Sequence, residues 1–211
     1  MATVKGEIFD LDGVIVDTAK YHFKAWKRLA DELQIPFTEE DNERLKGVSR
    51  VRSLEIILEI GGVEKSADEF QELMKKKNDW YVEMISHLDE SEILPGAKEY
   101  LLQSRAEGKK IALGSASKNA VMILEGLGII DLFDAIIDGN KVSKAKPDPE
   151  VFLKAADELG LKPEDCVVFE DAEAGVEAGR AGGMYVIGIG NPLILQEANR
   201  VVSGLDKLVH S

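Results

Sequence analysis

Short apolar segments alternate with helix-like segments through the second half of the chain, and this alternation limits the possible folds more than any other feature. The apolar segments are residues 110–115, 135–137, 166–169 and 184–189. The helix-like segments are residues 97–107, 119–126, 149–159 and 173–181. Strands that alternate with helices in this way indicate βαβ units and a parallel sheet.

The first half of the chain has a different pattern. A strand is predicted at residues 4–10, and from Thr18 the apolar spacing becomes helical. Further helices are predicted at residues 38–46, 50–60 and 66–87, with a loop at 47–49 and a capping box formed by Ser66 and Glu69. No strand is predicted between residues 18 and 90.

These patterns predict an α/β fold, with a Rossmann-like parallel sheet core and an inserted all-helical domain. The core would comprise residues 1–16 and 88–211, and the helical domain residues 17–87. The insertion begins five residues after Asp12. We therefore expect it to start at the rim of the site described next, where a mobile lid would be placed.

Two carboxylates end the first predicted strand, in the sequence Asp10-Leu11-Asp12-Gly13. Ligands bind at the carboxyl ends of strands in open α/β sheets, and neighbouring carboxylates repel each other unless a cation or a proton compensates. The pair therefore suggests Mg²⁺ with an aspartate nucleophile and an acid–base partner. The alternative is an ordinary turn, because Asp tolerates turn geometry and Gly supplies a positive φ.

Three later junctions between a strand and a helix carry groups that fit the same chemistry. Residues 115–119 offer hydroxyl and backbone N–H groups that would cradle a phosphate. Lys146, whose backbone the following proline restricts, would present a point charge to a phosphate or a carboxylate. Glu170 and Asp171 add two carboxylates, and a hard cation such as Mg²⁺ would stabilise this density of charge.

Each junction also has a simpler explanation when it is taken alone. Ser117 or Asn119 would cap the helix that follows. Lys146 would be a solvated loop lysine, and Asp171 would be a helix N-cap. The order of the motifs and their common position at the ends of strands favour one shared site.

Composition excludes several classes of partner. The chain has 211 residues with 39 acidic and 26 basic side chains, giving a net charge of −13. Nucleic acids and anionic membranes require a basic surface, so we expect neither as a partner, whereas a phosphorylated small molecule needs only a local cation. Cys166 is the only cysteine, which excludes an intrachain disulfide. With no signal-peptide pattern and no long apolar span, we expect a cytoplasmic protein, and a monomer.

Together the four motifs resemble those of the haloacid dehalogenase superfamily of phosphotransferases, over nearly the whole chain. The segment 10–14 with Asp17 and Thr18 resembles the first motif, and Ser115, Lys146 and Glu170-Asp171 resemble the other three. The predicted helical insertion resembles the cap that follows the first motif in that superfamily. Its dehalogenases lack the second aspartate, so Asp12 implies phosphoryl transfer.

The resemblance also implies a role for each core residue. Asp10 would be the nucleophile that forms an aspartyl phosphate, and Asp12 would be the general acid–base. Mg²⁺ would be held by the side chains of Asp10, Glu170 and Asp171 and by the main-chain carbonyl of Asp12. The phosphoryl oxygens would be bound by Ser115, Lys146 and backbone N–H groups near Leu11 and Ala116.

Four segments resemble the β-phosphoglucomutase family within that superfamily, namely residues 18–26, 45–50, 77–79 and 115–119. This implies interconversion of β-D-glucose 1-phosphate and glucose 6-phosphate through an aspartyl phosphate and β-glucose 1,6-bisphosphate. Arg50 would bind the distal phosphate, because a planar guanidinium suits that group. Its partners from the core would be Ser117, Lys118 and Asn119.

The same resemblance gives roles to three other residues of the insertion. His22 and Lys77 would contact the sugar phosphate or help to position Asp12, and Thr18 would gate Asp12. From the residues alone, His22 would be a histidine on a helix face, and Lys77 would be a solvated member of the run Lys75-Lys76-Lys77.

Two alternatives to a mutase remain at this point. One is a Mg²⁺-dependent phosphatase, acting on sugar phosphates or on phosphoglycolate-type substrates with the same core residues. The other is a catalytically silent binding protein that kept the fold. The complete core set argues against the silent protein, and Arg50 with Lys118 and Asn119 favours the mutase over the phosphatase.

Overall fold

The computed structural model describes residues 3–45 and 48–210. Residues 46 and 47, where the predicted loop 47–49 begins, lie outside the described residues. The described part of the chain forms two compact units, one from residues 3–17 and 88–210 and the other from residues 18–45 and 48–87. The first boundary lies one residue later than the division predicted from the sequence.

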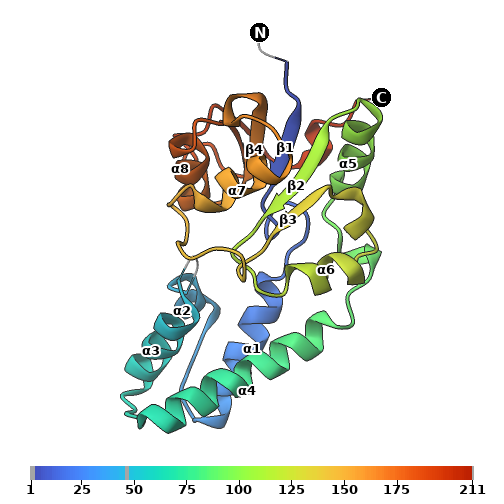
Figure 1. The fold of residues 1–211 in the computed structure, drawn as a ribbon. Helices are drawn as coiled ribbons and strands as arrows, with labels where there is room; N and C mark the ends of the chain where they lie inside the picture. The colour runs from blue at the N-terminus through green and yellow to red at the C-terminus, as the bar shows by residue number, and fades with distance from the viewer. Residues whose placement is uncertain (1–2, 46–47, 211) are drawn as a thin grey trace. The chain divides into compact units, whose positions relative to one another are not determined.

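The larger unit is built on a six-stranded sheet in which every neighbouring pair of strands is parallel. The predicted α/β fold with a parallel sheet is confirmed. The strand order is β3-β2-β1-β4-β5-β6, which places β1 and β4 side by side at the centre (Figure 1). The strands are β1 (Gly6–Phe9), β2 (Lys110–Gly114), β3 (Ala135–Ile137), β4 (Cys166–Glu170), β5 (Tyr185–Ile189) and β6 (Arg200–Val202).

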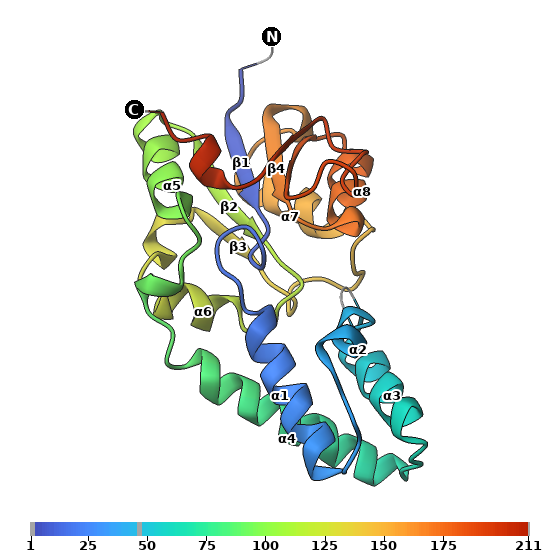
Figure 2. The same cartoon turned by 180° about the vertical axis from the view of Figure 1, so that it is seen from behind.

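Helices cover both faces of this sheet, and Figure 2 shows the same layers from behind. On one face, α7 packs against β1, β2 and β3, and α8 packs against β4 and β5. Their apolar residues, including Phe152 and Val176, form a core with Ile8 and Val168. On the other face, Tyr100 of α5 contacts the rings of Phe9 and Phe169 edge-on. The helices of this unit are α5 (Ala97–Ala106), α6 (Ala120–Gly126), α7 (Glu150–Glu158) and α8 (Glu173–Ala181), with short 3₁₀ helices η1 (Glu90–Glu92), η2 (Ile130–Leu132), η3 (Pro163–Asp165) and η4 (Leu205–Lys207).

The smaller unit is helical, and the described residues between 18 and 87 contain no strand. It comprises α1 (Ala19–Glu32), α2 (Glu39–Glu43), α3 (Arg50–Gly61) and α4 (Ala67–Ile85), and its own apolar core includes Trp26, Leu29, Leu54 and Ile57. The predicted capping box is present, because Ser66 Oγ accepts from Glu69 N and the Glu69 carboxylate accepts from Ser66 N. Throughout the described parts of both units, no helix has the length and apolarity needed to span a bilayer.

Candidate active site

The register of the central strands brings the first and fourth motifs together. Ile8 pairs with Val168 and Phe9 with Phe169, so Asp10 and Glu170 follow side by side at the ends of β1 and β4. The Asp10 N–H donates to Phe169 O at 3.0 Å, which continues the ladder to the nucleophile candidate. Because side chains alternate across a strand, Asp10 and Glu170 both point to the face covered by α7.

Three carboxylates gather at this edge of the sheet. One oxygen from each of Asp10, Glu170 and Asp171 lies within 4.8 Å of the others. Glu170 is almost completely buried and Asp10 nearly so, whereas Asp171 is exposed. The structure therefore brings together the three side chains expected to hold a metal.

Two glycines make room for these carboxylates. A Cβ added at Gly13, whose φ is +78°, would lie 1.9 Å from Asp171 Oδ2. A Cβ added at Gly175, in the first turn of α8, would lie 1.6 Å from Glu170 Oε2. Both contacts are far shorter than non-bonded atoms allow, so the positions of the two acidic side chains depend on these glycines.

Lys146 provides the counter-charge. Its Nζ donates to Asp10 Oδ1 at 3.1 Å, to Glu170 Oε2 at 2.9 Å and to the carbonyl oxygen of Gly114, at the end of β2, at 3.1 Å. The ammonium also lies 4.8 Å from the ring centre of Phe152, a cation–π arrangement. The solvated loop lysine considered from the sequence is therefore wrong.

The electrostatics of the cluster follow from burial and from like charges. Burial, and then the nearby charge of Asp10, raise the pKa of Glu170 well above its ordinary value. The same two causes raise the pKa of Asp171 to about 7. Burial alone would lower the pKa of Lys146, but Asp10 and Glu170 outweigh it and raise that pKa. Further positive charge nearby would stabilise the ionised form of these carboxylates.

The donor set fits a hard divalent cation. Carboxylate oxygens are the side-chain ligands that Mg²⁺ prefers, and one lysine leaves the three clustered carboxylates with a net negative charge. The nearby charge of Asp10, which adds to burial in raising the pKa values of Glu170 and Asp171, indicates the same deficit. Asp10, Glu170 and Asp171 are the residues that would hold the ion.

Asp12 lies in a tight turn directly after β1. The Gly13 N–H donates to Val16 O at 2.8 Å, and the Ile15 N–H donates to Leu11 O at 2.9 Å. Asp12 and Val16 also form an isolated bridge. The ordinary turn considered from the sequence is thus present. It places Asp12 next to the acidic cluster, so the turn alone does not explain the motif.

The second motif forms a loop braced by its own hydroxyl groups. Ser115 is buried, and its Oγ accepts from the Ser117 N–H at 3.1 Å, while Ser117 Oγ accepts from the Asn119 N–H at 3.2 Å. Neither Ser117 nor Asn119 acts as a side-chain cap of α6. The Ala116 carbonyl leaves no space for a side chain at Gly139, since an added Cβ there would lie 2.2 Å from Ala116 O.

The helix N-cap considered for Asp171 is wrong. Ala172, not Asp171, is the N-cap residue of α8, and no side chain caps that helix. The remaining loop residue of the predicted phosphate site, Lys118, is anchored through its backbone, because Asn140 Nδ2 donates to Lys118 O at 3.1 Å.

The helical unit contains a second polar cluster. Lys77 of α4 is 3% exposed, and its Nζ lies 2.8 Å from Nδ1 of His22 of α1. The imidazole stacks on Tyr81 with ring centres 3.9 Å apart, and the ammonium lies over the rings of Trp26 and Tyr81. The solvated lysine considered for Lys77 is wrong, and His22 has a specific partner rather than a plain position on a helix face.

Burial and neighbouring cations shift both groups toward their neutral forms. The pKa of Lys77 is lowered to about 7 by burial and then by the charge of Arg50. Burial, Lys77 and Arg50, in that order, lower the pKa of His22 to about 3. Arg50 is an exposed residue that begins α3, and Thr18 is a buried residue directly before α1. Their predicted roles stay predictions.

Sequence reasoning missed the aromatic rings that surround Lys77. The signal was available, because Met74, Lys77, Tyr81 and Ile85 follow a spacing of three, four and four along α4, and the last three are its buried residues. Lys77 occupies a position in the apolar stripe of α4, and this position distinguishes it from Lys75 and Lys76.

Comparisons with known proteins place this geometry in a family context. The model of the haloacid dehalogenase-like hydrolases matches residues 4–183. A curated relative, the β-phosphoglucomutase of Bacillus subtilis, is 49% identical over 201 residues, which is 94% of this chain and 89% of that protein. The phosphorylated carbohydrates phosphatase of Thermotoga maritima is 33% identical, over 84% of this chain and 81% of that protein.

Solved structures agree with these matches. The crystal structure of a β-phosphoglucomutase from Clostridium difficile superposes with a TM-score of 0.87 at 42% sequence identity. The match covers 98% of this chain and 93% of that one.

Proposed function

This chain belongs to the haloacid dehalogenase-like hydrolase family, and we propose that within it the protein is a β-phosphoglucomutase. It would interconvert β-D-glucose 1-phosphate and glucose 6-phosphate through an aspartyl phosphate and β-glucose 1,6-bisphosphate. The observation that carries the proposal is the complete core cluster of Asp10, Lys146, Glu170 and Asp171 in a chain so similar to the Bacillus subtilis enzyme.

In the first half-reaction, the Asp10 carboxylate attacks the phosphorus of the bisphosphate. A bond forms between Asp10 oxygen and phosphorus, and the bond from phosphorus to the sugar oxygen breaks. Asp12 gives its proton to the departing sugar oxygen. In the second half-reaction, Asp12 takes the proton from the attacking hydroxyl of the other sugar phosphate. That oxygen forms a bond to phosphorus, the bond from phosphorus to Asp10 oxygen breaks, and the bisphosphate and the free Asp10 carboxylate are regenerated.

Lys146, Ser115 and the N–H groups around Ala116 bind the phosphoryl oxygens while this charge moves. Lys146 also orients the Asp10 carboxylate through its hydrogen bond to Asp10 Oδ1. Mg²⁺, when held by Asp10, Glu170 and Asp171 with the Asp12 carbonyl, would neutralise the repulsion between the carboxylate and the phosphate.

A mutase must hand the phosphoryl group to a sugar phosphate and not to water, and this requires a second phosphate site. We assign that site to Arg50, with Ser117, Lys118 and Asn119. His22 and Lys77 would contact the sugar phosphate or position Asp12, and Thr18 would gate Asp12. The hydrogen bond between Lys77 and His22 supports a polar binding role, because such a pair is costly to bury without one.

A coupled assay tests the proposal. The protein receives β-glucose 1-phosphate, Mg²⁺ and a trace of the bisphosphate, and glucose 6-phosphate and free phosphate are measured together. Rapid isomerisation with little phosphate release is expected. Phosphate release without isomerisation would favour the second candidate, a sugar-phosphate phosphatase, which the likeness to the Thermotoga maritima enzyme supports.

Two variants connect the assay to residues. Asp10→Asn should abolish both turnover and phosphoenzyme formation, and an active Asp10→Asn protein would remove the nucleophile assignment. Arg50→Ala should lower isomerisation far more than hydrolysis of a simple phosphate ester. Equal losses of the two activities would contradict the distal phosphate role.

A further inference from the structure

The segment that carries Lys146 has no regular secondary structure of its own. It joins β3 to α7, and residues 141–148 contain neither helix nor strand. Most of these residues are exposed, so water competes for their backbone groups. Yet Lys146 Nζ makes three hydrogen bonds of 2.9–3.1 Å to groups on three different strands or strand ends. Something must fix the segment for the ammonium to stay there.

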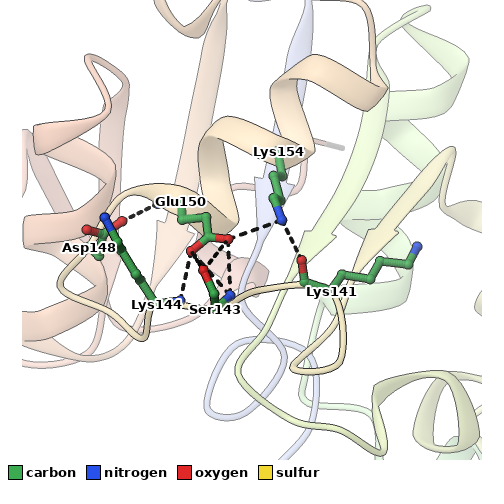
Figure 3. Close-up of polar contacts among 6 residues, drawn as sticks. All are labelled: Lys141, Ser143, Lys144, Asp148, Glu150 and Lys154. Carbon is green, nitrogen blue, oxygen red and sulfur yellow. Dashed lines mark hydrogen bonds and ion pairs between the residues drawn. The ribbon is translucent and has the colours of Figure 1, made fainter.

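The side chain of Glu150, at the start of α7, binds this segment directly (Figure 3). Its carboxylate accepts from the Lys144 N–H at 2.8 Å and from the Ser143 N–H at 3.1 Å. It also accepts from Ser143 Oγ at 3.1 Å. These contacts end two residues before Lys146 in the chain.

Lys154, one turn further along α7, completes the arrangement. Its Nζ lies 3.1 Å from Glu150 Oε1 and donates to Lys141 O at 2.7 Å. Figure 3 shows the Glu150 and Lys154 side chains pointing to the same stretch of backbone. The segment is therefore attached to α7 at Lys141, Ser143 and Lys144 by two neighbouring side chains.

The far side of Lys146 is attached to the same helix. Asp148 Oδ1 accepts from the Glu150 N–H at 3.0 Å, and the Asp148 N–H donates to Ala145 O at 3.0 Å. Phe152, two residues beyond Glu150, lies beneath the Lys146 ammonium. Glu150 thus joins the helix that supports the ammonium to the backbone that delivers it.

The same hydrogen bonds favour the charged form of the Glu150 carboxylate. Hydrogen bonding by the Ser143 backbone, followed by Lys154, lowers its pKa to about 2. A charged carboxylate forms stronger hydrogen bonds with N–H groups than a neutral acceptor does.

We propose that Glu150 is a positioning residue for phosphoryl transfer, because its carboxylate fixes the backbone before Lys146 and so aims that ammonium at Asp10 and Glu170. The inference rests on the role proposed for Lys146 in phosphoryl transfer. It does not depend on whether the acceptor is a sugar or water.

A double-mutant cycle tests it, with hydrolysis of p-nitrophenyl phosphate as the readout. Glu150→Ala should lower kcat by on the order of 10- to 100-fold, since misplacing a catalytic group by ~1 Å can cost about 10²-fold. KM should change little. In a Lys146→Ala background the same change should have almost no further effect, because the residue it positions is gone.

Glu158→Ala is the matched control. Glu158 is another acid of α7, exposed where Glu150 is half-buried, and it pairs with Lys141 Nζ only at 4.0 Å. This variant should keep wild-type kcat. Glu150→Gln retains one acceptor oxygen and should fall between wild type and Glu150→Ala, and it carries the same test if Glu150→Ala does not fold.

A second readout is the affinity for Mg²⁺ alone, measured by titration calorimetry at pH 8. Withdrawing the Lys146 ammonium from the carboxylates removes a positive charge that opposes the cation. Glu150→Ala and Lys146→Ala should therefore both bind Mg²⁺ several-fold more tightly, and the double variant no more tightly than either. General loosening of the site would weaken binding instead.

Three results would overturn the proposal: wild-type kcat in Glu150→Ala, multiplicative losses in the double variant, or unchanged or weaker Mg²⁺ binding in Glu150→Ala. Failure of the mutase assignment looks different. In that case the wild-type protein would hydrolyse p-nitrophenyl phosphate but would not isomerise β-glucose 1-phosphate. The double-mutant cycle could still be measured, because it uses only the hydrolysis.

Discussion

Gly175→Ala is the change whose effect can be worked out most directly from the geometry. The added Cβ would lie 1.6 Å from Glu170 Oε2 and 1.9 Å from Glu170 Cδ. Glu170 is 1% exposed and cannot turn toward solvent without leaving Lys146. We therefore expect the substitution to expel the Glu170 carboxylate from the acidic cluster.

Two terms of opposite sign set the size of the effect on stability. Breaking a buried ion pair by removing one partner costs about 3–5 kcal/mol. Alanine in place of glycine inside a helix gains up to about 1 kcal/mol. The free energy of unfolding should therefore fall by about 2–4 kcal/mol, and Mg²⁺ binding should weaken because one of the three clustered carboxylates is lost.

Chemical denaturation and Mg²⁺ titration measure these two effects. Gly182→Ala is the matched control, because Gly182 is the C-cap of the same helix and its nearest neighbour would lie 3.4 Å from the new Cβ. It should be close to neutral. Glu170→Asp in the Gly175→Ala background should recover part of the loss, since the shorter side chain relieves the clash. Wild-type stability and Mg²⁺ affinity in Gly175→Ala would refute the reasoning.

Three further predictions concern Lys77, Asp171 and Glu7. The pKa of Lys77, about 7, lies below its ordinary 10.5, so the unfolded chain binds more protons between these values and stability rises with pH. Relative to Lys77→Met, the free energy of unfolding should gain about 2 kcal/mol between pH 7 and pH 9 in denaturant titrations; a flat difference would contradict the shift. The pKa of Asp171, raised to about 7, makes protons compete with the cation, so Mg²⁺ should raise Tm more at pH 8 than at pH 5.5. Glu7→Ala deprives Tyr100 OH and Ser104 Oγ of the acceptor that they contact at 2.6 and 2.8 Å, and should cost about 3 kcal/mol by denaturation, against a smaller loss for Glu7→Gln.

The central elements of the fold could be predicted from the sequence because each carries a short apolar run. Three or four consecutive apolar residues lie within each of β2, β4 and β5, as buried strands of a parallel sheet require. The edge strand β6 was missed. It has three residues, begins with the exposed Arg200, and offers only Val201 and Val202 as a signal, so no periodicity could reveal it.

The core of the site was predictable for a different reason. Parallel strands deliver their carboxyl ends to one edge, so motifs at these ends converge whatever the details of packing. Asp10, Glu170 and Lys146 could be placed together on that basis. The role of Glu150 could not, because an acidic residue in the first turn of a helix is common and interacts favourably with the helix dipole. Only the position of the Ser143 and Lys144 N–H groups distinguishes it.

Lys77 shows most clearly where a pattern and a structure give different information. Three consecutive lysines look equivalent in sequence, yet Lys75 and Lys76 are exposed and form surface ion pairs, while Lys77 lies among aromatic rings. Burial of an ammonium group is unfavourable unless it is compensated, and here the contact to His22 Nδ1 compensates it only in part, since the pKa is lowered to about 7. We therefore expect an apolar residue at this position of α4 to give a more stable helical unit. Ligand binding therefore explains a lysine at this position better than folding does. The helical pattern of the sequence alone could not lead to this substrate-binding hypothesis for Lys77.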